Sequence, residues 1–350
     1  MVRRALVSAT NVNIAGQSWI QASLPARLGG LGVRAVSSLA LPCFVASLKS
    51  SLPLARTICP MLADSDPESL TLAVCQYAND FGVTVVPTGD DSLSQRTWDE
   101  AASKVRLDGL LNSANQVHRA RLLAASAPSS GAWLQVMPLP SLGLLMDSQT
   151  VRTSVALRLG EPICEPHPCR CGSQVDRLGH HGLSCRYSAG RLPRHANLND
   201  VVKRGLAAAG IPSWLEPVGL DRGDGRRPDG ITVFPYSQGK CLCWDATCVD
   251  SLSATAVVES AIESGSAAHS AERRKREKYR NLSERYIFEP LAVETMGVIG
   301  PSSRKFLAEL GRRIAAATGE RREQQWLVQR ISLAIARGNA AAILATGSNL

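Results

Sequence analysis

Two aspartates, Asp229 and Asp245, stand at facing positions in an expected β-hairpin. Asp229 follows Arg227-Pro228 at the head of one expected strand, and Asp245 ends the next strand sixteen residues later. A hairpin brings both carboxylates to one edge, where their oxygens could share a Mg²⁺ ion. Such an ion polarises a phosphate and lowers the pKa of a bound water. The spacing therefore predicts hydrolysis of a phosphodiester.

A basic run on the helix expected after the hairpin could complete this chemistry. Lys278 lies in that run and would position the attacking water or balance charge on the transition state, with Lys275 as the second choice. The same run is also typical of a solvated helix face or a nuclear import signal. The candidates for nucleic-acid contact are Arg227, Arg273, Arg274, Lys275 and Arg276.

The formal net charge of +9 lies mostly in the part of the chain that carries the two aspartates. Residues 151–350 contain 28 Lys and Arg against 20 Asp and Glu, whereas residues 1–150 contain 11 against 10. A basic region favours a polyanionic partner, because each neutralised phosphate releases condensed counterions. Charge and carboxylates together favour a nucleic acid as the partner.

A Cys/His cluster precedes this region and predicts a structural metal site. Three thiolates and an imidazole suit tetrahedral Zn²⁺, and four protein ligands leave no open position for catalysis. The spacing leaves alternatives open: His180 could replace His181, and Cys164 or His167 could replace Cys169. The four predicted ligands are Cys169, Cys171, His181 and Cys185.

Hydrophobic patterning predicts the elements that must position these side chains. The predicted strands are 231–235, 240–245 and 291–295. The predicted helices are 198–209, 267–282, 302–316 and 320–336. This order of helix, hairpin, helix, strand and helices favours a mixed sheet flanked by helices.

Residues 1–160 are expected to be mostly helical, after a glycine-rich turn at 24–34. We find no run of eighteen apolar residues and therefore expect no membrane partner. The start of the chain has no continuous apolar core typical of a secretory signal. Ten cysteines without such a signal favour free thiols and metal ligands in a reducing, intracellular compartment.

Several motifs between residues 169 and 343 resemble one known group of proteins. They include Cys169-Arg-Cys171-Gly, Leu178-Gly-His-His181-Gly-Leu-Ser-Cys185, Arg226-Arg227-Pro228-Asp229-Gly230, Trp244-Asp245-Ala-Thr247-Cys248 and Val293-Glu294-Thr295. The stretch resembles the restriction-enzyme-like endonuclease region at the C-terminus of non-LTR retrotransposon polyproteins, a branch of the PD-(D/E)XK nuclease superfamily. The turn at 24–34 resembles the stretch after the polymerase palm of such polyproteins, where a thumb-like region begins.

The resemblance implies an α+β or α/β fold with a helical N-terminal region, a small zinc knuckle and a restriction-endonuclease-like mixed sheet flanked by helices. The expected domains are a reverse-transcriptase thumb-like remnant at 1–60, a helical connector at 61–160, a Cys/His zinc knuckle at 161–190 and the endonuclease domain at 191–350.

The resemblance also implies an activity, namely nicking of double-stranded DNA in the nucleus. In that family the freed 3′ end primes reverse transcription of the element's RNA, which is a further possible partner. The two carboxylates correspond to Asp229 and Asp245, and the lysine can sit on the following helix. The strand position two residues after Asp245 is Thr247, so Lys278 is expected to act instead.

Polymerase activity is not expected, because the chain contains no Tyr-x-Asp-Asp signature. We therefore expect a C-terminal fragment of a retrotransposon polyprotein without its polymerase palm. Two other interpretations stay open. One is a catalytically inactive, zinc-containing fragment that binds nucleic acid, and the other is a decayed remnant of the element.

Overall fold

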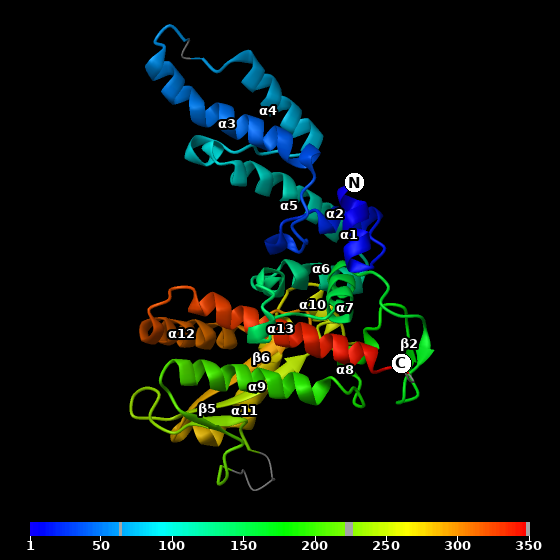
Figure 1. Cartoon of the computed structure of the whole chain (residues 1–350), viewed down its shortest axis with the longest axis vertical. Helices are drawn as coiled ribbons and strands as arrows, with labels where there is room; N and C mark the ends of the chain where they lie inside the picture. The colour runs from blue at the N-terminus through cyan, green and yellow to red at the C-terminus, as the bar shows by residue number, and fades with distance from the viewer. Residues whose placement is uncertain (63–64, 221–226, 348–350) are drawn as a thin grey trace.

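A four-stranded mixed sheet forms the centre of the lower body of the molecule (Figure 1). The computed structural model describes residues 1–62, 65–220 and 227–347. Across the sheet, the strands are β3 (Ser213–Leu215), β4 (Gly230–Thr232), β5 (Leu242–Val249) and β6 (Ile287–Glu294). β3, β4 and β5 pair antiparallel, whereas β5 and β6 pair parallel. The parallel pair requires a crossover, which contains α10 (Val257–Ser260) and α11 (Ser266–Lys278).

Different helices cover the two faces of the sheet. The helices on one face are α9 (Arg191–Ala208), α12 (Pro301–Thr318) and α13 (Glu323–Leu344). Trp244 and Ala246 of β5 share an apolar core with them. On the other face lies α11, whose Ala268 and Ala271 pack on the sheet. Because successive strand residues point to opposite faces, Asp245 points toward α11.

The last turns of α13 lie in close contact with the Cys/His segment and with the start of α9. The Cys/His segment contains β1 (His167–Pro168), β2 (Gln174–Val175) and α8 (His181–Ser184). Two glycines permit this approach. A Cβ on Gly182 would lie 2.8 Å from the Ala342 oxygen, and one on Gly190 would lie 2.4 Å from the Ala342 nitrogen.

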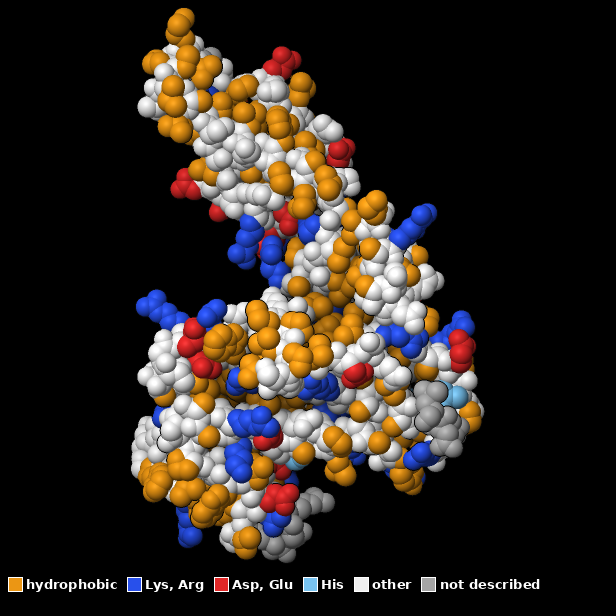
Figure 2. All heavy atoms as spheres, viewed as in Figure 1, with side chains coloured by type: hydrophobic (Ala, Val, Ile, Leu, Met, Phe, Trp, Pro, Cys, Tyr) orange, Lys and Arg blue, Asp and Glu red, His pale blue; other side chains and the backbone are white. Residues whose placement is uncertain are grey.

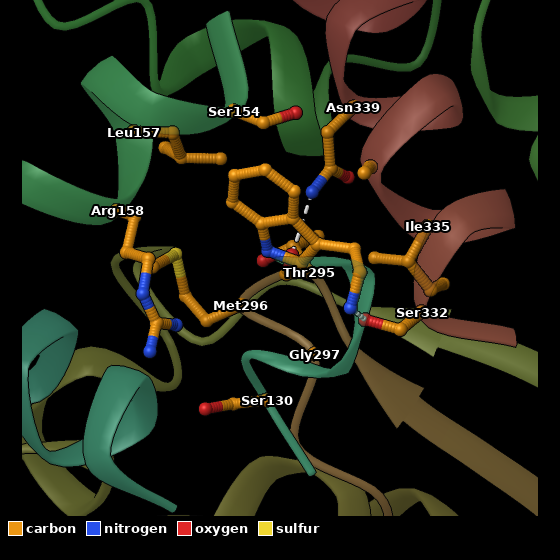
Figure 3. Close-up of a pocket in the computed structure, with 12 residues that line it drawn as sticks. Ser130, Ser154, Leu157, Arg158, Thr295, Met296, Gly297, Ser332, Ile335 and Asn339 are labelled. Carbon is orange, nitrogen blue, oxygen red and sulfur yellow. Dashed lines mark hydrogen bonds between the residues drawn. The ribbon is translucent and has the colours of Figure 1, made fainter. Parts of the chain in front are cut away.

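A buried arginine joins the same parts by hydrogen bonds. Arg194 donates from Nη1 to Asn339 Oδ1 at 2.8 Å and from Nη2 to the Leu183 oxygen at 3.2 Å. Asn339 Nδ2 donates in turn to the oxygen of Thr295, just beyond β6, at 2.6 Å. Thr295 and Asn339 also line a cavity of about 30 Å³ (Figure 3). A cavity of this size has room for water.

The N-terminal segment docks on the central helices through two further buried arginines. This segment contains α1 (Val2–Thr10), α2 (Gly16–Ala22) and η1 (Ala26–Leu28). The central elements are α6 (Gln116–Ser126), η3 (Ala132–Gln135), η4 (Pro140–Leu142) and α7 (Ser148–Leu159). Arg158 donates to the oxygens of Gly30 at 3.0 Å and Ala26 at 2.8 Å, and Arg121 donates to Gln21 Oε1 at 2.8 Å. Burial lowers the pKa of both guanidinium groups to about 10.

Three helices form a lobe that projects from the rest of the molecule (Figure 1). The elements of this lobe are α3 (Val36–Ile58), α4 (Glu68–Phe81), η2 (Gly89–Leu93) and α5 (Gln95–Ser113). Trp98 is fully buried at its centre, where its Nε1 donates to the Ser92 oxygen at 2.8 Å. α5 belongs to two cores, because Trp98 packs inside the lobe while Leu107 and Leu110 pack against Leu24.

The helix α3 is long and apolar enough to cross a membrane, judged by length and composition alone. The expectation that no stretch is long enough is therefore wrong by this measure. The helix contains Pro42 and Pro53, and it packs against α4 and α5. Only 17% of its apolar window is buried, and apolar side chains gather over the lobe (Figure 2). That the protein has no membrane partner stays a prediction.

The mixed helix-and-sheet class expected from the sequence is confirmed. The expected order of elements is also found, from α9 through the β4–β5 pair, α11 and β6 to α12 and α13. The domain division stays a prediction. Its first boundary, at residue 60, falls just after α3, and α3 shares an apolar core with α4 and α5.

Two details of the sheet differ from the expectation. Asp245 does not end its strand but is the fourth of eight residues in β5, and it is only 3% exposed. A charged residue signals a strand end in the sequence, yet here lysines of α11 stabilise the buried carboxylate. The strand expected at 231–235 ends at Thr232, and the short edge strand β3 was not expected.

The close approach of α13 gives a first prediction. Gly190→Ala should lower the free energy of unfolding by about 1–3 kcal/mol, because the added methyl meets the backbone of α13. Chemical denaturation of the full chain measures this change.

Gly109→Ala is the matched control for that substitution. Gly109 lies in α5 with nothing within 4 Å of an added Cβ. Alanine there should raise stability by about 0.5–1 kcal/mol, because it favours the helix. Equal effects at both positions would contradict the packing described for α13.

Candidate functional site

Asp229 comes immediately before β4, and Asp245 lies within the neighbouring strand β5. Gly230 pairs with Trp244, and the antiparallel register places Asp229, the next residue outward, across from Asp245. The Asp229 N–H donates to the Trp244 oxygen at 2.9 Å. Gly230 is required here, because a Cβ would lie 2.1 Å from the Trp244 ring. The register therefore brings together the two carboxylates that the sequence paired.

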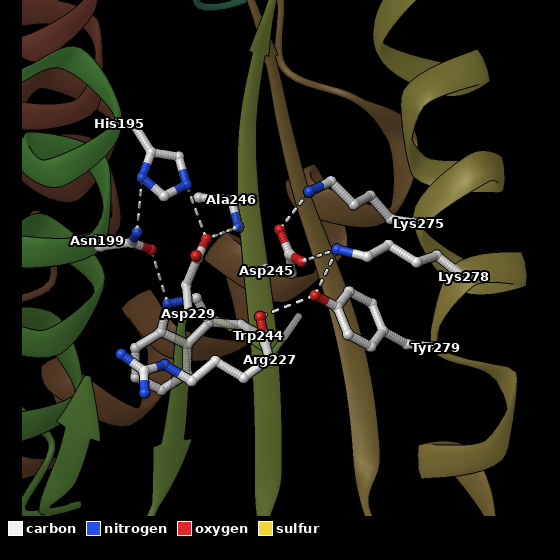
Figure 4. A network of polar contacts seen from close by, with 10 residues as sticks. All are labelled: His195, Asn199, Arg227, Asp229, Trp244, Asp245, Ala246, Lys275, Lys278 and Tyr279. Carbon is white, nitrogen blue, oxygen red and sulfur yellow. Dashed lines mark hydrogen bonds and ion pairs between the residues drawn. The ribbon is translucent and has the colours of Figure 1, made fainter. Parts of the chain in front are cut away.

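The Asp229 carboxylate is held beside β5 by a backbone group and a histidine (Figure 4). Its Oδ2 accepts a hydrogen bond from the Ala246 N–H at 2.6 Å and lies 2.9 Å from His195 Nε2. His195 comes from α9, and its Nδ1 lies 3.5 Å from Asn199 Nδ2. Asn199 Oδ1 accepts from Trp244 Nε1 at 3.0 Å. One end of the site is therefore oriented by α9.

The Asp245 carboxylate is held by two lysines of α11 (Figure 4). Lys275 Nζ forms an ion pair with Asp245 Oδ1, and Lys278 Nζ lies 3.6 Å from Oδ2. Lys278 also donates to Tyr279 Oη at 2.7 Å, and Tyr279 donates to the Arg227 oxygen at 2.9 Å. The structure therefore places both candidate lysines at Asp245, with Lys275 closer.

Electrostatics couple His195 to Asp229. The hydrogen bond to Asp229 raises the pKa of His195, and burial opposes that shift. Burial alone would raise the pKa of Asp229, but the hydrogen bond and charge of His195, together with hydrogen bonds from the Ala246 N–H and Asn199, outweigh burial and lower it. The pair therefore favours an ionised carboxylate beside a protonated imidazole.

His195 and Asn199 were predicted neither as catalytic nor as metal-binding residues, although the stretch Arg194-His195 with Leu198-Asn199-Asp200 is part of the resemblance. They stand four residues apart and so lie on one face of a helix. That spacing is a signal available in the sequence, but it does not reveal that this face meets Asp229. The contact depends on how α9 packs across β5, which is a tertiary feature.

The predicted nucleic-acid contacts occupy different surroundings. Arg227 pairs with Glu216, and Arg276 lies 3.4 Å from Glu289. Arg273 and Arg274 are exposed and line a groove beside the site. Arg226, from the same sequence motif, lies outside the described residues.

A second site lies in the Cys/His segment and could bind a metal ion. The ligand atoms of Cys169, Cys171, His181 and Cys185 all lie within 4.8 Å of one another. Cys169 Sγ lies 3.8 Å from Cys185 Sγ, and Cys171 Sγ lies 3.2 Å from His181 Nε2. Hydrogen bonds from Ser173 lower the pKa of Cys171 to about 6. Three sulfurs and one nitrogen are compatible with tetrahedral Zn²⁺.

The alternative ligands lie outside this group. Cys164 Sγ lies 3.3 Å from the Asp176 oxygen, and His167 Nε2 lies 3.0 Å from Thr346 Oγ1. His180 is mostly buried, and burial lowers its pKa to about 4. The four residues brought together are thus the four first chosen from the sequence.

No protein-family model matches this chain, and no curated protein matches it.

The Cys/His group predicts about one tightly bound zinc per chain. His181→Asn and Cys185→Ser should each reduce bound zinc to near zero, because each removes one of four converging ligands. Metal content after gel filtration, measured by mass spectrometry, tests this. Cys164→Ser is the matched control and should retain zinc. Zinc loss in Cys164→Ser with retention in Cys185→Ser would contradict the ligand set.

The His195–Asp229 pair predicts a pH-dependent contribution to stability. The His195 contribution is complete below pH 6.5 and is lost as pH rises through its raised pKa. The Asp229 contribution is present above pH 3.8 and is lost as pH falls through its lowered pKa. Asp229→Asn should therefore lower the free energy of unfolding most between pH 3.8 and pH 6.5. The loss should be at most about 1 kcal/mol, because the imidazole is partly exposed and solvent screens the pair.

The same variant should lower the pKa of His195, because burial then acts without the carboxylate. Nuclear magnetic resonance titration of the histidine ring measures this shift. Asp200→Asn is the control, since Asp200 pairs with Arg204 on α9 instead. An unchanged His195 pKa in Asp229→Asn would contradict the pairing.

Proposed function

We propose that this protein is a divalent-metal-dependent DNA endonuclease. The observation that carries the proposal is the placement of Asp229 across from Asp245, with two lysines of α11 at Asp245. Two carboxylates and a lysine are the groups that the sequence assigned to phosphodiester hydrolysis. The structure supports their assembly from three separate segments of the chain.

The oxygens of Asp229 and Asp245 suit Mg²⁺, a hard cation that prefers carboxylate and water ligands. When bound, the ion supplies an activated water and charge on the phosphate. A comparison with two other buried carboxylates supports this use of Asp245. Glu272 accepts from the N–H groups of Ser302 and Ser303, at the start of α12, and Glu294 accepts from the Ala268 N–H. Asp245 is held instead by flexible lysine side chains, which can move away.

Each residue of the site has a defined role in this proposal. His195 and the Ala246 N–H orient Asp229, so its second oxygen can face the cation. Lys275 and Lys278 are only 23% and 26% exposed, and Asp245 would hold the cation with its oxygens once the two lysine side chains turn toward the phosphate. There they orient the attacking water and balance the charge of the transition state. The helix α11 thus replaces a lysine on β5, where Thr247 stands.

The biological setting is part of the same proposal. The motifs around the Cys/His group and the two aspartates resemble those of non-LTR retrotransposon polyproteins, and the order of knuckle, helix and mixed sheet agrees with that resemblance. In this setting, nicking of double-stranded target DNA in the nucleus frees a 3′ end that primes reverse transcription. The restriction-endonuclease-like architecture belongs to this proposal too.

A second candidate function is nucleic-acid binding without cleavage, by an inactive fragment or a decayed remnant of the element. One observation favours it. Asp229 already accepts from Ala246 and His195, and Asp245 already pairs with lysines, so both carboxylates are satisfied without a cation. Binding of Mg²⁺ must then displace protein partners, which weakens it.

Nicking of supercoiled plasmid by the full chain with Mg²⁺ separates the two functions. Asp245→Asn should abolish nicking and leave DNA affinity nearly unchanged, because the amide keeps the shape but not the charge. Lys275→Ala should slow nicking by about 100-fold or more, as expected for loss of a group that stabilises the charge of the transition state. Gel electrophoresis of the nicked circle measures both rates.

Asp200→Asn is the matched control, because it removes an exposed carboxylate of α9 that pairs with Arg204. It should nick like the wild type. A folded, zinc-loaded wild type that binds DNA but does not nick it would overturn the nuclease and favour the binding fragment. Nicking that survives in Asp245→Asn would exclude this carboxylate as the site.

A further inference from the structure

A groove of about 530 Å³ lies at the carboxyl end of β5, between the starts of α9 and α11. Its floor includes Cys248 and Val249 of β5. Its walls carry exposed arginines from both helices, namely Arg191, Arg273 and Arg274. The hydroxyl-bearing residues Ser253, Thr255 and Ser270 also line it.

The groove lies farther along the strand that carries Asp245. Cys248 and Val249 follow Asp245 by three and four residues, which is about 10–13 Å at the usual rise of a strand. The flanking helices continue in the same direction. Arg191 stands one turn before His195 on α9, and Arg274 stands one residue before Lys275 on α11. Both helices therefore extend from groups that contact the carboxylates to arginines that line the groove.

The charged groups of the groove differ in what they can bind. Arg194 and Asp250 are buried and engaged within the protein, with Asn339 and Thr295 respectively. Glu259 is an exposed carboxylate at the rim. The three exposed arginines outnumber it and give the groove a net positive charge. Arginine and hydroxyl side chains are among those that contact the phosphate oxygens of DNA.

We infer that this groove holds backbone phosphates of the DNA strand that is cut. The inference rests on the proposed nuclease and specifies how its substrate lies. A strand has one phosphate per 3.4 Å of helix axis, so the groove receives phosphates about three to four positions from the one at the carboxylates. Because phosphates carry no sequence information, these contacts position the strand and do not select its sequence.

Salt dependence of DNA binding by the full chain tests the groove without any cleavage. In EDTA, Arg191→Gln and Arg273→Gln should each reduce the slope of log affinity against log salt by about 1, because each removes one phosphate contact. Arg4→Gln removes the same charge from exposed α1, which packs on α7 away from the sheet, and should leave the slope unchanged. Circular dichroism shows whether each variant is folded.

Nicking with Mg²⁺ gives the second readout. The two groove variants should raise KM for DNA and keep kcat, because they bind the strand but do not touch the reacting phosphate. Unchanged slopes, or slopes that fall equally in Arg4→Gln, would overturn the groove and leave the nuclease standing. Reduced slopes in a protein that never nicks would support the groove while the nuclease proposal fails.

Discussion

The lower body of the molecule depends on the hydrogen bonds that the buried guanidinium of Arg194 donates. The guanidinium needs acceptors inside the protein, because an unpaired buried charge is very costly. Its acceptors come from α8 and from Asn339 of α13, and Asn339 reaches the backbone after β6. The next residue along α9 is His195, so the same network also positions the contact between His195 and Asp229. The Cys/His segment, the sheet and the candidate site are thus parts of one hydrogen-bonded unit.

Most of the elements around the site follow from local sequence patterns. The helix α9, the pair of strands β4 and β5 and the basic helix α11 could be predicted from periodicity and turn residues. The four residues of the Cys/His group, which could bind a metal ion, could be predicted from their types and spacing. What could not be predicted depends on contacts between distant segments. Asp245 lies inside β5 because lysines thirty and more residues later neutralise it, and His195 joins the site because α9 crosses that strand. Neither of these contacts can be predicted from local sequence patterns.

The structure uses buried carboxylates in two ways. Glu272 and Glu294 accept backbone N–H groups at the starts of helices and fix the positions of those helices on the sheet. Asp245 points into the space between β5 and α11, where its partners are long side chains on a helix. Backbone partners cannot leave without unfolding a turn, whereas lysines exchange partners by rotating their side chains. Glu272 and Glu294 thus hold the backbone of α11 in place on the sheet, while the lysine side chains that contact Asp245 can still rotate.

The helix α5 has a mechanical consequence for the molecule. Its first half is buried in the projecting lobe around Trp98, and its second half is buried in the body around Leu107 and Leu110. A helix of nineteen residues is a stiff rod about 28 Å long. The body end of this rod packs against Leu24, in the glycine-rich turn. A force applied to the tip of the lobe would therefore be transmitted to the N-terminal segment that Arg121 and Arg158 hold in place.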